Sequence, residues 1–170
     1  MKNQDIVWDL PTRVFHWIVA IPVLLNFFLE GGELPHKILG YVALIGLLLR
    51  LIWGFKSTSH SRLAHFPLKR SEVWDYLASI AKREPKMYVG HNPIASWVYL
   101  LIWLMVVSLG VSGFMMGLDA FWGEEWLEEI HEALSNILMG LVLLHLGGIF
   151  FDSIKFKRKT WLGMITGKKS

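Results

Sequence analysis

Four long runs of apolar side chains dominate the sequence and are separated by more polar segments. The runs cover residues 12–29, 35–55, 94–118 and 130–151. The third contains no charged residue and is longer than the roughly 20 residues that a helix needs to cross the hydrocarbon of a bilayer. A helix of a soluble bundle would carry a polar stripe, and the third run offers only three serines. The pattern predicts an all-α fold, a four-transmembrane-helix bundle that forms one integral-membrane domain over residues 1–170.

The composition is typical of a membrane protein and excludes every site that depends on cysteine. Hydrophobic residues make up 54% and charged residues 18% of the 170 residues, whereas about a quarter of a soluble domain is charged. The sequence has no cysteine, which excludes disulfides, thiolate nucleophiles, iron–sulfur clusters and covalent C-x-x-C-H haem attachment. Any metal or cofactor must be held by histidine, carboxylate, methionine or tyrosine. The polar start contains acidic residues and no small-residue cleavage site, so we expect no removable signal peptide.

The distribution of charge between the connecting segments predicts the orientation in the membrane. Lysine and arginine gather between the second and third runs and in the tail after the fourth. Segment 119–129 has no basic residue and five acidic ones: Asp119, Glu124, Glu125, Glu128 and Glu129. The positive-inside rule therefore places both termini in the cytoplasm and segment 119–129 outside, in a multi-pass protein of the bacterial cytoplasmic (inner) membrane. Segment 66–88 is expected to be an amphipathic helix on the lipid of the inner leaflet. The net positive charge is thus a topology signal and indicates no nucleic-acid partner.

Four histidines lie in or at the ends of the apolar runs, at two matched depths. His16 and His145 lie towards the cytoplasmic ends of the first and fourth runs, and we call them the inner pair. His36 and His131 open the second and fourth runs on the outer side, and we call them the outer pair. Residues fourteen apart on an α-helix are separated by nearly four whole turns and about 21 Å. His131 and His145 are therefore expected to point in nearly one direction at two levels.

Two pairs of imidazoles at two depths suit bis-histidine ligation of two haems. A six-coordinate haem iron takes one imidazole on each side of its ring, which favours electron transfer because no coordination position stays open. The sequence therefore predicts two non-covalent haems b, one held by the inner pair and one by the outer pair. Hydrogen bonding between helices, a proton relay and another kind of metal site remain alternatives for these side chains.

Five further side chains have roles that the pattern leaves open. Arg13 and Arg50 lie near the inner boundary, where they can pair with propionates of the inner haem or extend to lipid headgroups. His60 and His65 are expected to be solvated loop residues. His91 borders the third run at the inner surface, where it can contact a haem propionate or a quinone, or replace one of the four ligands.

Five segments of the chain resemble the bacterial cytochrome b561 family, which is related to the b-type cytochrome subunit of nickel–iron hydrogenases. They read WDLPTRVFHW, HKILGYVALIGLLLRLIWGF, YVGHNPIASW, IHEALSNILMGLVLLH and MITGKK, and they are spread over nearly the whole chain. The resemblance implies a four-helix membrane protein with two non-covalent haems b, liganded at His16, His36, His131 and His145. Depth matching selects the same four residues.

The resemblance also implies electron transfer between the quinone pool and a periplasmic redox partner, such as a c-type cytochrome or a dehydrogenase. We therefore expect a membrane dihaem b-type cytochrome of a respiratory chain, with quinone as its substrate in the membrane. The acidic segment 119–129 is suited to steering a basic c-type cytochrome by charge.

Three alternatives to this function stay open. A superoxide:quinone oxidoreductase would need positive charge beside the outer haem, but the outer face is acidic apart from Lys37. A b-type subunit of a hydrogenase or dehydrogenase complex ranks lower because the extra helix common in hydrogenase cytochromes b has no counterpart among the four runs. A histidine-based proton-conducting membrane protein is the third alternative, and the apolar runs offer it no buried Asp or Glu.

Overall fold

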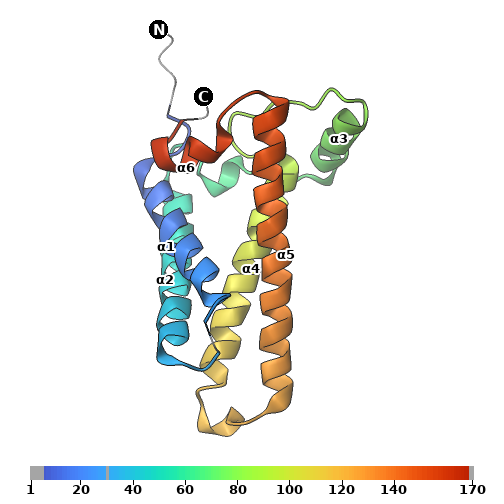
Figure 1. Ribbon diagram of the computed structural model, residues 1–170. Coiled ribbons are helices and arrows are strands. Elements are labelled where there is room, and N and C mark those ends of the chain that lie inside the picture. The colour runs from blue at the N-terminus through green and yellow to red at the C-terminus, as the bar shows by residue number, and fades with distance from the viewer. Residues whose placement is uncertain (1–5, 30, 169–170) are drawn as a thin grey trace.

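The computed structural model describes residues 6–29 and 31–168, and within them every regular element is a helix. The α-helices, in chain order, are α1 (Leu10–Asn26), α2 (Leu34–Lys56), α3 (Arg70–Ala81), α4 (Pro93–Met115), α5 (Glu125–Lys155) and α6 (Gly163–Thr166) (Figure 1). Single turns of 3-10 helix lie between them: η1 (Leu63–His65), η2 (Asp119–Phe121) and η3 (Thr160–Leu162). The all-α prediction is confirmed.

Three of these helices, α2, α4 and α5, are long and apolar enough to cross a membrane. α1 is also apolar but has 17 residues, slightly fewer than the roughly 20 that a span needs. Large apolar side chains point outward along the long helices, and Ile45, Leu104 and Leu143 are each more than half exposed. Apolar surface on this scale suits contact with lipid. The chain is therefore a multi-pass membrane protein.

The helices differ from the predicted apolar runs mainly at their ends. α5 begins at Glu125 rather than at residue 130. Its first turn carries Glu125 and Glu128, because negative side chains are favoured at the positive N-terminal end of a helix dipole. α1 begins before residue 12 because the Asp9 side chain accepts a hydrogen bond from the Thr12 N–H at 3.0 Å and caps it. Apolar periodicity locates the buried part of a helix, whereas polar caps set where it starts.

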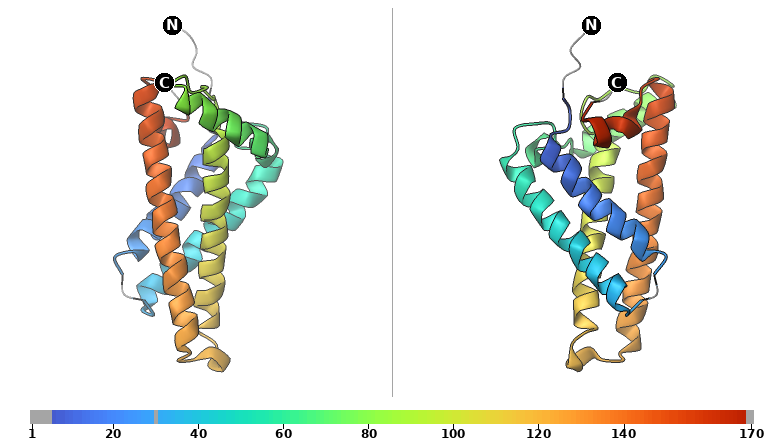
Figure 2. Two further views of the ribbon diagram at one scale, coloured as in Figure 1. Left: turned by 90° about the vertical axis from the view of Figure 1, so that its right-hand side faces the viewer. Right: turned by 60° about the vertical axis from the view of Figure 1, so that its left-hand side comes forward.

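The three long helices and α1 pack as two hairpins. α1 lies along α2, α4 lies along α5, and α2 contacts α4 to join the hairpins. Figure 2 shows the first hairpin inclined across the second. The apolar core forms where they meet, around Leu47, Val106 and Leu138. Gly46 permits the close approach of α1 and α2, because a Cβ atom at this position would lie 2.5 Å from Cγ2 of Ile18.

One end of the bundle gathers both described chain ends together with α3 and α6 (Figure 1). The backbone N–H groups of Val7 and Trp8 donate to the carbonyl of Gly167 at 2.8 and 3.0 Å. The indole N–H of Trp17 donates to the carbonyl of Met164 at 3.1 Å. The connection between α4 and α5 lies at the opposite end. The segments predicted to share one side of the membrane therefore share one end of the bundle.

Asp9 fastens the start of α1 to the end of α2. Its Oδ2 atom accepts a hydrogen bond from the Trp53 indole at 3.2 Å. The same atom accepts from the hydroxyls of Ser57, Ser59 and Ser61 at 2.9, 2.8 and 3.1 Å. Burial acts to raise the pKa of the Asp9 carboxyl, but hydrogen bonds to neighbouring side chains outweigh it and hold this pKa well below its usual value.

A largely buried ion pair closes the same end of the bundle at the end of α5. Arg158 donates to both carboxylate oxygens of Asp152, from Nε at 2.7 Å and from Nη2 at 2.6 Å. The Thr160 hydroxyl donates to the same carboxylate, and Arg158 also donates to the carbonyl of Tyr88 at 3.2 Å. The basic tail after the fourth run thus folds against the bundle, and Arg158 is a structural residue.

The segment 66–88 contains a helix, as the sequence predicts, in the form of α3. Trp74 is 70% exposed, whereas Tyr76 and Ser79 are buried. The Tyr76 ring packs edge to face on Tyr88, with 5.6 Å between the ring centroids. α3 therefore has one face against the protein and keeps a large aromatic side chain on the other.

Candidate functional site

The structure brings the four histidines of the apolar runs together as the inner pair and the outer pair. In the inner pair, the rings of His16 on α1 and His145 on α5 have centroids 6.4 Å apart and planes inclined by 57°. In the outer pair, the rings of His36 on α2 and His131 on α5 are 6.2 Å apart and inclined by 56°. Each pair thus joins one helix of the first hairpin to α5.

The spacing within each pair matches two imidazoles that share one metal ion. A metal–imidazole bond is about 2 Å long and a ring nitrogen lies about 1.1 Å from its ring centroid, so such imidazoles have centroids about 6 Å apart. Two imidazoles are an incomplete ligand set for a bare ion, whereas a haem iron needs only two ligands from the protein because its macrocycle supplies the other nitrogens. The donor set of both pairs therefore fits haem.

A cavity between the hairpins contains the outer pair. Its lining includes both histidines together with Gly40, Gly110 and Ser135. Two buried polar atoms on this cavity, Nδ1 of His36 and Oδ1 of Asn26, have no hydrogen-bond partner in the part of the chain that the structure describes. Buried polar atoms are normally paired. The outer pair therefore lies beside a cavity with unused hydrogen-bonding capacity.

Helix α4 contacts the His131 ring through Ser112 and Gly113. The Ser112 hydroxyl lies 2.8 Å from Nδ1 of His131. A Cβ atom on Gly113 would lie 3.4 Å from Cε1 of the same ring, in van der Waals contact, so the imidazole lies directly against α4. The sequence analysis did not select Ser112 as a site residue. Its one signal is a hydroxyl within an otherwise apolar run.

Aromatic side chains contact the inner pair. The Trp17 ring lies edge to face with His16, at 5.2 Å between centroids. Tyr99 on α4 makes a similar contact with His145, also at 5.2 Å. Tyr99 was likewise not selected from the sequence, because a single tyrosine in a membrane span has many structural roles.

His91 lies one aromatic ring away from the inner pair. Its ring contacts Tyr99 at 4.7 Å between centroids, Trp8 at 4.6 Å and Phe66 at 4.4 Å. Tyr99 in turn contacts His145. His91 is therefore part of an aromatic cluster beside the inner pair, whereas the imidazoles that face each other are those of the two pairs.

Arg50 is buried inside the bundle and does not extend to the lipid surface. Only 6% of its surface is exposed. Nη2 donates to the carbonyl of Ser61 at 2.9 Å, and the guanidinium carbon lies 5.5 Å from the Trp103 ring centroid. Nη1 is buried without a hydrogen-bond partner among the described residues. A buried cation with an unused donor is suited to holding an anionic group.

Arg13 lies against the C-terminal segment at the same end of the bundle. Its Nη1 donates to the carbonyl of Ile165, and its Nε is buried without a partner in the described ranges. Arg13 therefore has one donor committed to the fold and one unused.

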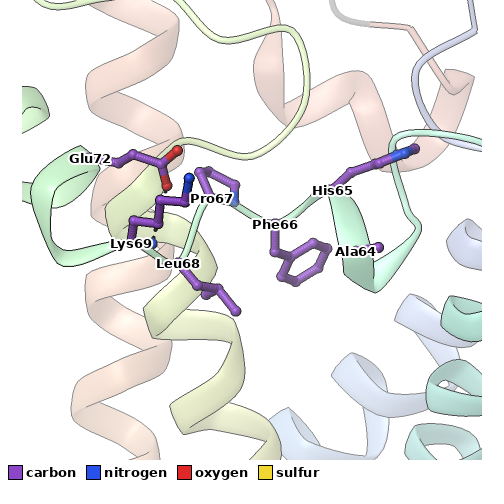
Figure 3. A pocket seen from close by; sticks show the side chains of 7 residues that line it. All are labelled: Ala64, His65, Phe66, Pro67, Leu68, Lys69 and Glu72. Carbon is purple, nitrogen blue, oxygen red and sulfur yellow. Dashed lines mark hydrogen bonds between the residues drawn. The ribbon is translucent and has the colours of Figure 1, made fainter.

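The two loop histidines lie outside both pairs, and both are exposed as predicted. Nδ1 of His65 lies 3.1 Å from the carbonyl of Ser59. Figure 3 shows His65 beside an open hollow lined by residues 64–69 and Glu72, with its ring directed away from Phe66 and Leu68. This hollow belongs to the connection between α2 and α3 and does not reach either pair of histidines.

Comparisons with known proteins identify the family and several relatives of this chain. The profile of the family described as prokaryotic cytochrome b561 matches residues 7–167. The chain is 28% identical over 153 residues to the probable Ni/Fe-hydrogenase B-type cytochrome subunit of Bradyrhizobium diazoefficiens, which covers 73% of this chain and 62% of that protein. It is 29% identical over 139 residues to the probable Ni/Fe-hydrogenase 1 B-type cytochrome subunit of Escherichia coli K12, which covers 65% of this chain and 59% of that protein.

The chain spans about three fifths of the length of these curated relatives. No solved structure matches it at a significant level.

Proposed function

This chain belongs to the prokaryotic cytochrome b561 family, and from that premise we propose a membrane cytochrome that holds two haems b and passes electrons between a quinone and a redox partner outside the membrane. The family and its hydrogenase-type relatives are b-type cytochromes, so haem b and electron transfer belong to the chain as well.

The proposed ligands are His16 with His145 and His36 with His131. The observation that carries the proposal is that these rings lie next to each other in two pairs, at 6.4 and 6.2 Å between centroids. Haem b held by these histidines would supply a one-electron carrier. Both pairs share α5, which therefore fixes the separation of the two sites. Since each pair also uses a helix of the first hairpin, ligation would tie the two hairpins together at two levels.

Arg50 and Arg13 are the proposed partners of haem propionates at the inner pair. Arg50 is buried, and its Nη1 has no hydrogen-bond partner among the described residues. A propionate would supply the hydrogen-bond acceptor that Nη1 lacks and the negative charge that a buried guanidinium requires. Arg13 offers its Nε at the same end of the bundle.

The proposed topology has four spans, with both termini in the cytoplasm of a bacterium. It rests on the lysine and arginine content of the segments at the end that carries the chain termini. In this orientation the inner pair lies on the cytoplasmic side. The α4–α5 connection, which ends at Glu124, and the first turn of α5, which carries Glu125 and Glu128, lie on the periplasmic side. The acidic connection would attract a basic partner such as a c-type cytochrome.

A second candidate function is that of an electron-transfer subunit in a hydrogenase or dehydrogenase complex. The names of the relatives favour it, because they are described as subunits of Ni/Fe-hydrogenases. In this case the outer haem would receive electrons from a bound enzyme in place of a diffusing cytochrome. Reduction of the haems by hydrogen gas in native membranes would support this candidate, and reduction only through added c-type cytochrome would support the first.

Single histidine substitutions test the proposed ligands. In the purified full chain, His131→Ala and His145→Ala should each leave one haem of the two, and the remaining haem should differ between them in midpoint potential. His65→Ala is the matched control, because it removes an exposed imidazole outside both pairs, and it should keep both haems. Two haems in either pair variant, measured as haem per protein, would contradict the assignment.

A further inference from the structure

Ser112 and His131 form a polar contact between helices that has no counterpart at the other three span histidines among the described residues. The hydroxyl oxygen of Ser112 lies 2.8 Å from Nδ1 of His131, and Ser112 is only 5% exposed. Nδ1 of His36 has no partner among the described residues. The inner pair contacts aromatic rings instead, those of Trp17 and Tyr99.

The direction of this hydrogen bond follows from a second contact of the same hydroxyl. Ser112 also donates to the carbonyl of Leu109, one turn earlier on α4, at 3.2 Å. A hydroxyl has one hydrogen and two lone pairs. Only the Nδ1–H tautomer of His131 satisfies both contacts at once, because the hydroxyl then donates to Leu109 and accepts from the ring. This selects the tautomer in which the Nε2 lone pair of His131 is free to bind a metal.

A hydrogen bond from Nδ1–H of an imidazole also changes how strongly its Nε2 donates electrons to a metal. It gives the ring more negative character and makes it a stronger electron donor to a bound metal. A stronger donor stabilises ferric iron more than ferrous iron, because the ferric state carries the larger positive charge. Such a hydrogen bond therefore lowers the midpoint potential of the iron that it serves.

We propose that Ser112 is a positioning residue for the outer haem, which fixes the tautomer of His131 and lowers the midpoint potential of that haem alone. The inference rests on the proposed function in one respect, that His131 is a ligand. Gly113, the next residue on α4, lies beside the same ring, since a Cβ atom there would be 3.4 Å from Cε1 of His131. The two haem sites would thus differ in potential because α4 supplies a hydrogen-bond acceptor to only one of them.

Redox titration of the full chain, followed in the visible α-band, tests this inference. Ser112→Ala should raise the midpoint potential of one haem by about 59 mV, the one-electron equivalent of a tenfold change in relative affinity for the two oxidation states. The potential of the other haem should not move. Ser108→Ala is the matched control, because it removes a hydroxyl one turn earlier on the same helix, and it should leave both potentials unchanged.

Two further variants assign the shift to a site and separate it from a packing defect. In the His145→Ala background, which should keep only the outer haem, Ser112→Ala should still produce the shift. Ser112→Thr keeps the hydroxyl and should restore the wild-type potentials. The inference is overturned if both haems of Ser112→Ala keep their potentials, if the shift is found in the haem that survives in His131→Ala, or if Ser112→Thr behaves like Ser112→Ala. A wild-type chain without haem would overturn the proposed function itself.

Discussion

The ring of His36, in the first turn of α2, faces the ring of His131, on α5, with 6.2 Å between their centroids. The inner pair repeats this relationship at a second level of the same bundle. Both levels include a residue of α5, and the two residues are separated by nearly a whole number of helical turns. α5 therefore aligns the two candidate haem sites, and the first hairpin completes each of them.

Loss of the Arg50 charge should weaken haem binding at one site only. Arg50→Met keeps the length and apolar character of the buried side chain but removes the unused donor at Nη1. We expect retention of the inner haem to fall roughly tenfold, as is typical for side chains that orient a bound group, while the outer haem stays. Arg62→Met is the control, because it removes the same charge from an exposed position nearby. Equal loss of both haems, measured by haem content after dilution, would show that Arg50 acts only on the fold.

Removal of the Asp9 carboxylate should loosen the attachment of α1 to α2. Asp9→Asn keeps an oxygen for the Thr12 cap but puts an NH2 group, which cannot accept a hydrogen bond, where Oδ2 accepts from Trp53 and the serines. We expect a loss of about 1–3 kcal/mol in the free energy of unfolding at neutral pH. Reversible unfolding in detergent measures it. An unchanged free energy would mean that the serines pair equally well without the charge.

The contribution of Asp9 should also depend on pH with a defined sign. Its pKa is lowered in the folded protein, whereas the unfolded value is near 3.8. The stabilisation is therefore fully present above about pH 4 and is lost as the pH falls towards the folded pKa. The difference in stability between wild type and Asp9→Asn should stay constant from pH 7 to about pH 5 and shrink in stronger acid. A difference that already falls between pH 7 and pH 5 would contradict the assignment to this carboxyl.

A side chain at position 46 should push the first hairpin apart. The Cβ atom of Gly46→Ala would lie 2.5 Å from Cγ2 of Ile18, a branched side chain with little freedom to move away. We expect a destabilisation of roughly 1–3 kcal/mol and weaker haem binding at the inner pair, since Ile18 follows His16 closely on α1. Gly140→Ala is the control, because no atom lies within 4 Å of its added Cβ. Equal stability of the two variants would exclude close packing at Gly46.

Negative charge at the start of α5 should control the rate at which a basic partner exchanges electrons with the protein. Glu125, Glu128 and Glu129 are exposed, and their combined change to glutamine should slow reduction of a basic c-type cytochrome several-fold at low ionic strength. The variant should also lose most of the salt dependence of the rate. Glu84→Gln, at the opposite end of the bundle, is the control. Stopped-flow rates that do not depend on salt in the wild type would exclude electrostatic steering.

The helices and the pairing of the histidines could be predicted because each depends on a regular repeat. Apolar runs fix which residues can lie in lipid, and the spacing from His131 to His145 fixes their common direction on one helix. The ends of α5 and α1 could not be predicted as well, because they depend on acidic first turns and on the Asp9 cap. That His16, His36, His131 and His145 bind haem remains a prediction.

The sequence pattern could not predict the roles of residues that contact distant segments of the chain. In the sequence Ser112 is one of three serines in an apolar run, and only the packing of α4 on α5 shows its contact with His131. In the sequence Arg158 is one of several basic residues of the tail, and only the structure shows its ion pair with Asp152. From the sequence Arg50 could equally extend to the lipid headgroups, and only its burial shows that it lies in the protein interior.

Low-temperature electron paramagnetic resonance of the oxidised, purified full chain, combined with a haem-to-protein ratio, tests the paired-histidine sites most directly. We expect two haems b per chain and two low-spin ferric signals of bis-histidine type, one of which is missing in His131→Ala and the other in His145→Ala. A single haem per chain, or a high-spin signal from five-coordinate iron in the wild type, would contradict the assignment of two opposed imidazoles to each iron.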